Sequence, residues 1–434
     1  MKYAEYSNYK FSGTEWIGDI PSEWECRRLK DCGALLAGAG FPHEYQGLED
    51  EELPFYKVGD LSQSLDGRHM ASGKHTISRA TAYTLRAKVI PPSAIVYAKI
   101  GAALFLNRRR ITVKNCCIDN NMTAFIPNQQ KLSTAWANYW LCTLDFGEFT
   151  NPGAVPSLSE GYQATLPITL PPLDEQQIIA RFLDAKTAQI DALVAQKRQL
   201  IAKLKEKRSA LIARTVTRGL PPEAAKAAGL EPHSEMKDSG VEWMGVVPKT
   251  WEVIPLKWRA RCSSGDGIAT EDVETNETTN SNIPVIGGNG LMGYAAGSNI
   301  DHQILVIGRV GALCGNVHIV NPPAWITDNA LVLRPKTGVF DNRYLAHVLR
   351  FRNLNDIAAK TAQPLITGTQ VRDQRVPCPS IPEQIAMADF LDSECLKLDG
   401  LSCATETAIG RLTEYRQALI TSAVTGKIDV REPA

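Results

Sequence analysis

The stretch Gly13-Thr14-Glu15-Trp16-Ile17-Gly18-Asp19-Ile20-Pro21-Ser22-Glu23-Trp24 returns later in the chain as Gly240-Val241-Glu242-Trp243-Met244-Gly245-Val246-Val247-Pro248-Lys249-Thr250-Trp251. Both copies follow the frame G-x-E-W-x-G-x-x-P-x-x-W without a gap. Two tryptophans, two glycines and a proline do not recur at one spacing by chance, so the chain contains a duplicated module. We expect the tryptophans of both copies to pack the entry of each module rather than to stack on a ligand.

A second repeated segment follows each module. Pro171-Pro172-Leu173-Asp174-Glu175-Gln176, with Phe182-Leu183-Asp184 after it, returns as Pro379-Ser380-Ile381-Pro382-Glu383-Gln384 and Phe390-Leu391-Asp392. The offset is 208 residues, and it holds as far as Val216-Thr217 and Val424-Thr425. The chain therefore alternates a variable region with a matched tail, twice.

Each tail predicts one long helix. Residues 174–217 contain neither proline nor glycine, and Asp174 is the expected N-cap. Residues 175–218 carry ten basic and four acidic side chains, whereas residues 381–434 carry five and nine, so opposite charges favour pairing between the two tails. An amphipathic helix lying on a globular core is the alternative. Gly400 and Gly410 should each weaken the second helix by about 1 kcal/mol relative to alanine.

A heptad pattern that starts with Leu183 at position a runs through both tails in the same phase. Val194 and Ile201 widen the apolar stripe at position e. The a and d positions of the predicted helix-pair interface are Leu183, Ile190, Leu193, Leu200, Leu204, Leu211, Leu391, Leu398, Leu401, Leu412 and Leu419.

The variable regions are rich in glycine, proline and short β-type runs. Residues 94–98 and 303–307 predict buried strands, and residues 138–142 and 343–349 predict short helices. The expected fold class is α+β, with two tandem mixed α/β domains separated by two long antiparallel coiled-coil helices. A pseudo-two-fold axis is expected to relate the two halves. The expected boundaries are 1–170, 171–232, 233–378 and 379–434.

Composition narrows the class of protein. The chain has 434 residues, no net charge and no apolar run long enough to span a membrane, and its first residues lack the apolar core of a signal peptide. We therefore expect a cytoplasmic protein. Ten cysteines occur without a C-x-x-C pair, which predicts reduced thiols and no metal site.

The residues count against three functions: an adenine methyltransferase, a nuclease and a scaffold. Asn321-Pro322-Pro323-Ala324 is close to the N-P-P-aromatic loop of adenine methyltransferases, but Ala324 cannot stack on a flipped base, and Gly38-Ala39-Gly40 is a lone G-x-G. An acidic pair with E-x-K spacing for a nuclease metal is missing. Asp119 and Asp328 recur beside an asparagine and are expected to cap their own turns. A scaffold without DNA affinity has no reason to vary the interior of a duplicated domain.

The ordered motifs resemble the specificity subunit of type I restriction–modification systems. The resemblance rests on the W-x-G-x-x-P-x-x-W opening, the P-P-x-x-E-Q helix start, its F-L-D continuation and the duplication, and it covers essentially the whole chain. It implies two target recognition domains that read an asymmetric bipartite site in double-stranded DNA. It also implies two methyltransferase subunits as partners and, optionally, two restriction–translocase subunits. S-adenosylmethionine, ATP and Mg would then be bound by those partners, and this chain would be non-catalytic with no cofactor of its own.

Basic and amide side chains in the variable regions are the candidate DNA contacts. Arg108, Arg109, Arg110 and Lys114 form the densest basic cluster, for which a solvated charge run is the alternative. Lys99 and Arg309 are matched basic residues after the two predicted strands. Asn289 lies in a glycine-rich loop, where an ordinary hairpin is the alternative. The weaker candidates are Lys57, Arg68, Lys74, Lys360 and Gln363.

Overall fold

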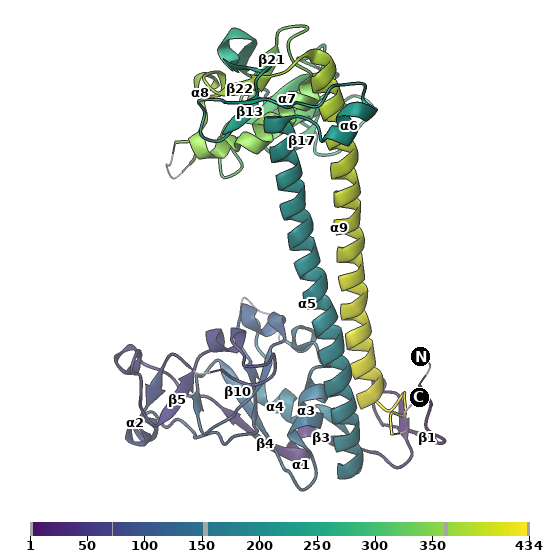
Figure 1. The fold of residues 1–434 in the computed structure, drawn as a ribbon. Helices are drawn as coiled ribbons and strands as arrows, with labels where there is room; N and C mark the ends of the chain where they lie inside the picture. The colour runs from purple at the N-terminus through teal and green to yellow at the C-terminus, as the bar shows by residue number, and fades with distance from the viewer. Residues whose placement is uncertain (1–2, 72, 151–154, 360–362, 432–434) are drawn as a thin grey trace. The chain divides into compact units, whose positions relative to one another are not determined.

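The computed structural model describes all residues except 1–2, 72, 151–154, 360–362 and 432–434. The chain forms two compact units (Figure 1). Unit 1 consists of Met1–Gln196 and Ala408–Ala434, and unit 2 consists of Lys197–Thr407. Each unit therefore contains one variable region and parts of both long helices.

A four-stranded antiparallel sheet forms the centre of unit 1. Its strand order is β4 (Gly33–Ala37), β10 (Met122–Pro127), β7 (Ile95–Ala98), β8 (Arg109–Ile111). All four residues of β7 are buried, which confirms the strand predicted at 94–98. A three-stranded sheet of β6 (Thr76–Ile77), β5 (Leu53–Tyr56) and β9 (Cys117–Ile118) lies in the same unit, and helix α3 spans Thr134–Leu141.

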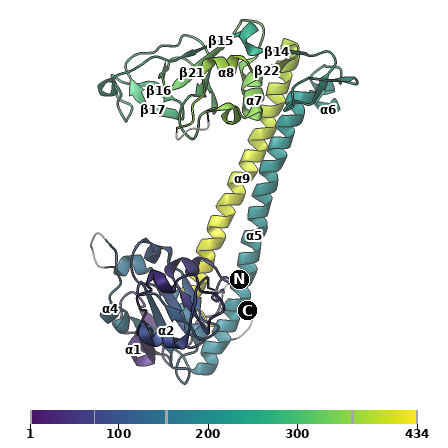
Figure 2. The same cartoon turned by 90° about the vertical axis from the view of Figure 1, so that its left-hand side faces the viewer.

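Unit 2 repeats this topology (Figure 2). Its four-stranded sheet has the order β15 (Ala260–Ser264), β21 (Ala330–Pro335), β18 (Ile304–Gly308), β19 (Val317–Val320). The second sheet contains β17 (Gly290–Ala295), β16 (Ile283–Gly287) and β20 (Trp325–Ile326), and helix α7 spans Asn342–Arg352. The duplication therefore extends through the interior, where sequence similarity is weak.

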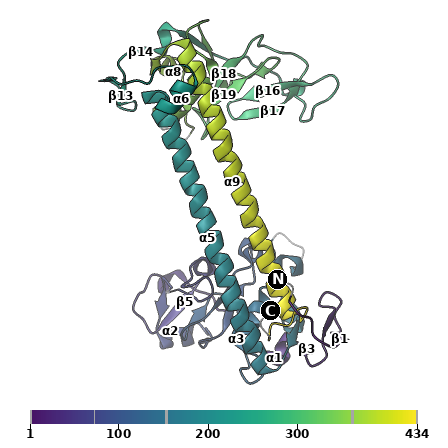
Figure 3. The same ribbon diagram turned by 45° about the vertical axis from the view of Figure 1, so that its right-hand side comes forward.

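The remaining elements are short. In unit 1 they are β1 (Tyr9–Phe11), β2 (Asp19–Pro21), β3 (Glu25–Arg28), α1 (Leu29–Cys32), η1 (His43–Tyr45), η2 (Val58–Ser62), α2 (Arg79–Thr84), η3 (Ala102–Leu106), η4 (Phe146–Phe149), α4 (Glu160–Thr165) and β11 (Pro167–Leu170). In unit 2 they are α6 (Pro222–Ala227), β12 (Met236–Asp238), β13 (Val246–Pro248), β14 (Glu252–Pro255), η5 (Leu256–Trp258), η6 (Thr270–Asp272), η7 (Leu354–Ile357), α8 (Gly368–Arg372) and β22 (Arg375–Cys378). Figure 3 shows α6 beside the first turns of α9.

Both long helices are continuous: α5 spans Leu173–Arg218 and α9 spans Ile381–Val424. They run antiparallel within each unit. In unit 1, Arg416 of α9 lies 3.0 Å from Asp191 of α5, and in unit 2, Arg208 of α5 lies 3.3 Å from Asp399 of α9. The two pairs are related by the 208-residue offset. The prediction that Asp174 is the N-cap is wrong, because α5 begins one residue earlier and Asp174 lies in its first turn.

The buried stripe of α5 follows the predicted a positions but not the predicted d positions. Leu193 and Leu200 are 46% and 47% exposed, and Leu401 of α9 is 55% exposed, so placing these three residues in the interface is wrong. The partners of the a positions lie at the predicted e positions, including Val194 and Ile201. Leu183, Ile190, Leu391, Leu398 and Leu419 are buried, and Leu204, Leu211 and Leu412 are partly buried.

Tryptophan side chains pack the repeated opening segment of each unit, residues 13–24 and 240–251. Trp24 and Trp251 are buried, and Trp24 meets Trp136 of α3 edge to face at 5.4 Å. Trp243 packs on Phe351 at 5.8 Å, whereas Trp16 is half exposed and tilts against Trp140. The predicted packing role is therefore confirmed most fully for the second tryptophan of each copy.

Unit 1 contains both the first and the last described segments of the chain (Figure 1). Ala4 pairs with Asp429 in an antiparallel bridge, and Thr169 donates its hydroxyl to the carbonyl of Val424 at 2.6 Å. The end of α9 and the segment after it thus pack against the first described residues and β11 of unit 1. Among the described residues, no helix combines the length and apolar character that crossing a membrane requires.

Candidate functional site

A buried glutamine on each long helix anchors the neighbouring short helix. In unit 1, Gln176 accepts from the backbone amide of Ser133 and donates to the carbonyls of Lys131 and Pro171, each at 2.9 Å. Ser133 is the N-cap of α3. One side chain therefore fixes both the start of α3 and the turn that leads into α5.

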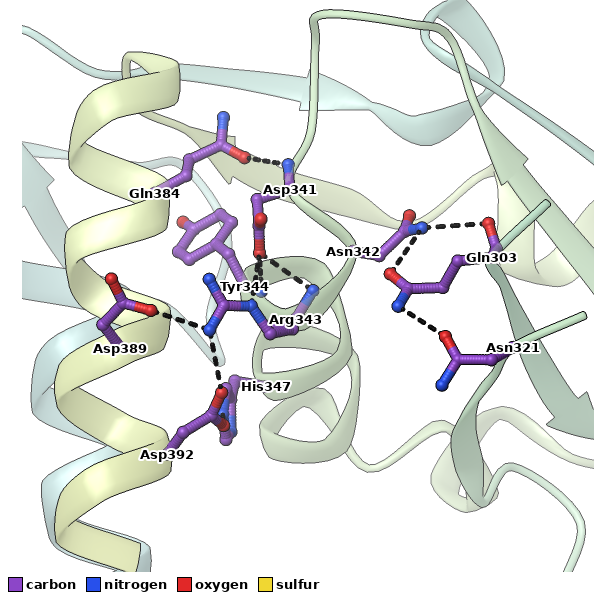
Figure 4. Close-up of polar contacts among 10 residues, drawn as sticks. All are labelled: Gln303, Asn321, Asp341, Asn342, Arg343, Tyr344, His347, Gln384, Asp389 and Asp392. Carbon is purple, nitrogen blue, oxygen red and sulfur yellow. Dashed lines mark hydrogen bonds and ion pairs between the residues drawn. The ribbon is translucent and has the colours of Figure 1, made fainter.

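Unit 2 contains the same anchor (Figure 4). Gln384 accepts from the amide of Asp341, the N-cap of α7, and donates to the carbonyls of Val339 and Pro379, again at 2.9 Å each. All four residues of the anchor follow the 208-residue offset. The glutamine of the repeated E-Q pair is thus a structural anchor, and its neighbours Glu175 and Glu383 hold the entry segments through Tyr6 and His233.

A second contact joins the short helix to the long one. Tyr139 of α3 donates to Asp184 of α5 at 2.7 Å, and Arg68 pairs with the same carboxylate at 2.6 Å. In unit 2, His347 of α7 lies 2.9 Å from Asp392 of α9, and Arg343 reaches Asp389 at 2.7 Å (Figure 4). Arg68 is therefore engaged in a domain–helix contact in this structure.

The carboxyl ends of the two central strands carry the matched basic residues. Lys99 follows β7 and pairs with Glu160 at 2.9 Å. Arg309 follows β18 and donates to the hydroxyl of Ser264 at 3.2 Å and to the carbonyl of Asp328 at 3.3 Å. Both residues lie at the carboxyl end of an interior strand of their sheet, where they stay candidate DNA contacts.

A short turn lies beside each of these basic residues: residues 119–121 precede β10, and residues 327–329 precede β21. Asp119 caps its own turn, as predicted: its carboxylate accepts from the amides of Asn121 at 2.8 Å and Val58 at 3.3 Å. The match of Asp119 with Asp328 is wrong by one residue, however. The backbone amide of Lys99 donates to Asn121, and that of Arg309 donates to Asn329, so Asn120 corresponds to Asp328.

The side chains of the basic cluster at residues 108–110 differ in burial, because β8 begins at Arg109. Arg109 is 5% exposed, donates to the carbonyls of Asn107 at 2.6 Å and Leu144 at 2.5 Å, and stacks over Phe146. Its predicted phosphate contact is therefore wrong, because β8 alternates its side chains between the two faces of the sheet and turns Arg109 inward. Arg108 and Arg110 are partly exposed, and Lys114 is exposed.

The other predicted contacts are scattered. Lys57 donates to Gln46 at 3.1 Å, and Lys74 is exposed. Asn289 is exposed in the two-residue turn between β16 and β17, where Gly287 pairs with Gly290, so the loop is a hairpin. Gln363 is exposed, and Lys360 lies outside the described residues.

The cysteines, the acidic and histidine side chains, and the N-P-P-A stretch are placed as follows among the described residues. These residues contain no group of three or more histidine, cysteine, aspartate or glutamate side chains placed to hold a metal ion, and all ten cysteines are free thiols. Asn321 of the N-P-P-A stretch accepts from Gln303 at 2.9 Å, and Gln303 in turn bonds to Asn342 at the start of α7 (Figure 4). Asn321 therefore has a structural partner.

Two mixed α/β units that share a pair of long helices define the class of fold. The chain belongs to the family described as type I restriction modification DNA specificity domain, whose model matches residues 21–203 and 248–396. It is 34% identical over 137 residues, 32% of the chain, to the Type I restriction enzyme EcoprrI specificity subunit of Escherichia coli. It is 25% identical over 297 residues, 62% of the chain, to the EcoBI specificity subunit of the same organism. The chain spans 33% and 60% of the lengths of these two curated relatives.

Solved structures share the fold over nearly the whole chain. A chain of a type I R-M system, from a study of complex assembly and conformational transition, matches with a TM-score of 0.70 at 16% identity, covering 93% of this chain and 98% of that one. The HsdS subunit from Thermoanaerobacter tengcongensis matches with a TM-score of 0.50 at 16% identity, covering 94% and 98%. The predicted α+β class with two long helices is confirmed.

Proposed function

We propose that this chain is the DNA specificity subunit of a type I restriction–modification complex and that each unit reads one half of a bipartite site. The observation that carries the proposal is the pair of identical anchors, Gln176 and Gln384, around interiors that differ in sequence. Because the same hydrogen bonds are present in both units, the two variable regions are attached to the long helices in equivalent ways. Their different surfaces then recognise different half-sites, so the full site is asymmetric.

The chain itself carries out no bond chemistry in this proposal. Methyl transfer belongs to two methyltransferase subunits, which bind S-adenosylmethionine, and cleavage belongs to optional restriction–translocase subunits, which use ATP and Mg. The complex acts on double-stranded DNA in the cytoplasm. Incubating the purified chain with S-adenosylmethionine and DNA should give no methylation, and measurable transfer would contradict the non-catalytic assignment.

Two exposed leucines at matched positions fit the docking of two identical partners. Leu193 of α5 lies in unit 1 and Leu401 of α9 lies in unit 2, and they are 46% and 55% exposed. A single exposed leucine is ordinary on a protein surface, so the support comes from its recurrence at the equivalent position of the other unit. We assign them to the contact with the methyltransferase subunits.

The test is co-expression of the chain with the methyltransferase subunit of its complex, followed by mapping of methylated adenines in genomic DNA. Methylation at one bipartite, asymmetric sequence supports the proposal. Methylation without a sequence preference, or none, contradicts it. Leu193→Asp with Leu401→Asp should reduce co-purification of the methyltransferase, while Leu200→Asp, at a similarly exposed leucine without an apolar match of equal size, is the control.

A further inference from the structure

The turn beside each central strand is built in the same way in both units. In unit 1 the turn comprises residues 119–121, between β9 and β10. The amide of Met122 donates to the carbonyl of Asp119 at 3.0 Å, the amide of Ala39 donates to Ile118 at 3.0 Å, and the amide of Lys99 donates to Asn121 at 2.8 Å. One bond therefore closes the turn on itself, and the bonds from Ala39 and Lys99 attach it to two other segments.

The corresponding turn of unit 2 comprises residues 327–329, between β20 and β21. The amide of Ala330 donates to Thr327 at 3.0 Å, the amide of Asp266 donates to Ile326 at 3.0 Å, and the amide of Arg309 donates to Asn329 at 3.2 Å. The three bonds match those of unit 1 one for one. The backbone of the turn is thus constant between the two units.

A glycine lets the neighbouring strand end approach each turn. A Cβ at Gly38 would lie 1.9 Å from the carbonyl oxygen of Asp119, and a Cβ at Gly265 would lie 2.4 Å from that of Thr327. Neither glycine can be replaced without moving the turn, since no side chain fits at such distances. The glycines therefore lock the turn against the sheet.

The middle residue of the turn is the exposed position that differs between the two units, because the first residue is buried in both. Asn120 occupies it in unit 1 and Asp328 in unit 2, and both residues are exposed, whereas the next residue is asparagine in both units. A partly exposed basic residue, Lys99 or Arg309, is bonded to each turn through its backbone amide. The exposed, variable residue of such a turn is suited to contact a base edge. The neighbouring basic side chain is suited to contact the adjacent phosphate.

We propose that Asn120 and Asp328 are specificity-determining residues that contact base edges in the DNA major groove. The inference rests on the proposed function. An asparagine amide both donates to and accepts from adenine, whereas an aspartate carboxylate accepts from the amino group of cytosine. Unit 1 would therefore prefer adenine at the position facing Asn120, and unit 2 would prefer cytosine at the position facing Asp328.

The test is a selection from a random duplex DNA library with the assembled complex. The variants are Asn120→Asp, Asp328→Asn and the double exchange, which keeps the net charge. We expect Asn120→Asp to change the preferred base at one position of one half-site and Asp328→Asn to change one position of the other half-site. Each change should alter the preference at that position by about tenfold or more.

Matched controls separate base reading from a general effect of charge. Asn115→Asp adds a charge at an exposed asparagine of unit 1, and Asp301→Asn removes one ahead of β18, and neither should move a base preference. Preferences that stay unchanged in all three variants, with a defined wild-type site, would overturn the inference and leave the proposed function intact. A wild-type complex without any sequence preference would overturn both. Asn120→Ser, which adds no charge, checks that a loss of preference is not caused by repulsion.

Discussion

Tyr139 of α3 donates its hydroxyl to Asp184 of α5 at 2.7 Å, and the same position of unit 2 holds His347, 2.9 Å from Asp392 of α9. The two contacts have the same place in the fold but different titration behaviour. Burial raises the pKa of Tyr139 to about 12. Burial lowers the pKa of His347, and nearby Arg350 and Arg208 lower it further, although Asp392 acts in the opposite direction.

The stability of unit 2 should therefore fall in mild acid. Because the pKa of folded His347 lies below its unfolded value of about 6.5, the unfolded state binds more protons as the pH drops through that range. We expect the unfolding temperature of unit 2 to fall as the pH is lowered from about 7.5 to about 5.5. His347→Gln, which can still donate to Asp392 but does not titrate, should flatten this dependence. A variant with the same pH profile as the wild type would contradict the assignment to His347.

The glutamine anchors should contribute strongly to stability. Gln176→Ala or Gln384→Ala removes three hydrogen bonds and leaves buried backbone groups without a partner, so each should cost about 2–4 kcal/mol of unfolding free energy. Chemical denaturation measures the loss. Gln177→Ala, at an exposed glutamine of the same helix, is the control and should change little. Equal effects at positions 176 and 177 would show that the anchor has no energetic role.

Neighbouring arginines of the basic cluster should respond differently to mutation. Arg109→Ala leaves Phe146 and two carbonyl groups without their partner, so it should lower stability by about 2 kcal/mol or more. Arg108→Ala should keep the unfolding temperature but weaken binding to all DNA sequences, with a salt dependence shallower by about one ion. Binding at several salt concentrations together with thermal unfolding separates the two effects. Loss of DNA affinity without loss of stability in Arg109→Ala would contradict the structural role.

The corrected heptad phase predicts which apolar side chains of α5 stabilise the helix pair. Ile190→Ala should cost about 2–4 kcal/mol, since its side chain is buried. Leu193→Ala should stay within about 0.5 kcal/mol, because Leu193 is half exposed. Urea unfolding of the two variants compares them directly. The opposite ranking would restore the phase that the sequence favoured.

The long helices and the duplication could be predicted from the sequence because they depend on local patterns. The absence of glycine and proline between 174 and 217 and the 208-residue offset need no tertiary information. The heptad phase was misassigned because leucines at 193 and 200 fit a d position by composition alone. In the structure, the e positions are covered instead: Thr187 contacts Tyr139 of α3, and Arg208 pairs with Asp399 of α9. Polar residues at such positions give little sequence signal.

The site was harder to predict, since side-chain direction decides which residues reach DNA. Three consecutive arginines at 108–110 look equivalent in sequence, but one of them is buried because the strand alternates its faces. The Asn120–Asp328 match was missed by one residue, because the Asp-Asn dipeptide is a stronger signal than a turn whose first residue changes to threonine. The 208-residue offset of the tails, carried back to residue 120, leads to Asp328 and could have revealed the match.

The two units should read their half-sites independently. The most direct test replaces residues 1–165 with the corresponding domain of another member of the family and maps adenine methylation in cells that also express the methyltransferase subunit. We expect a new sequence in one half-site, with the other half-site retained. A change in both half-sites, or in neither, would contradict independent reading.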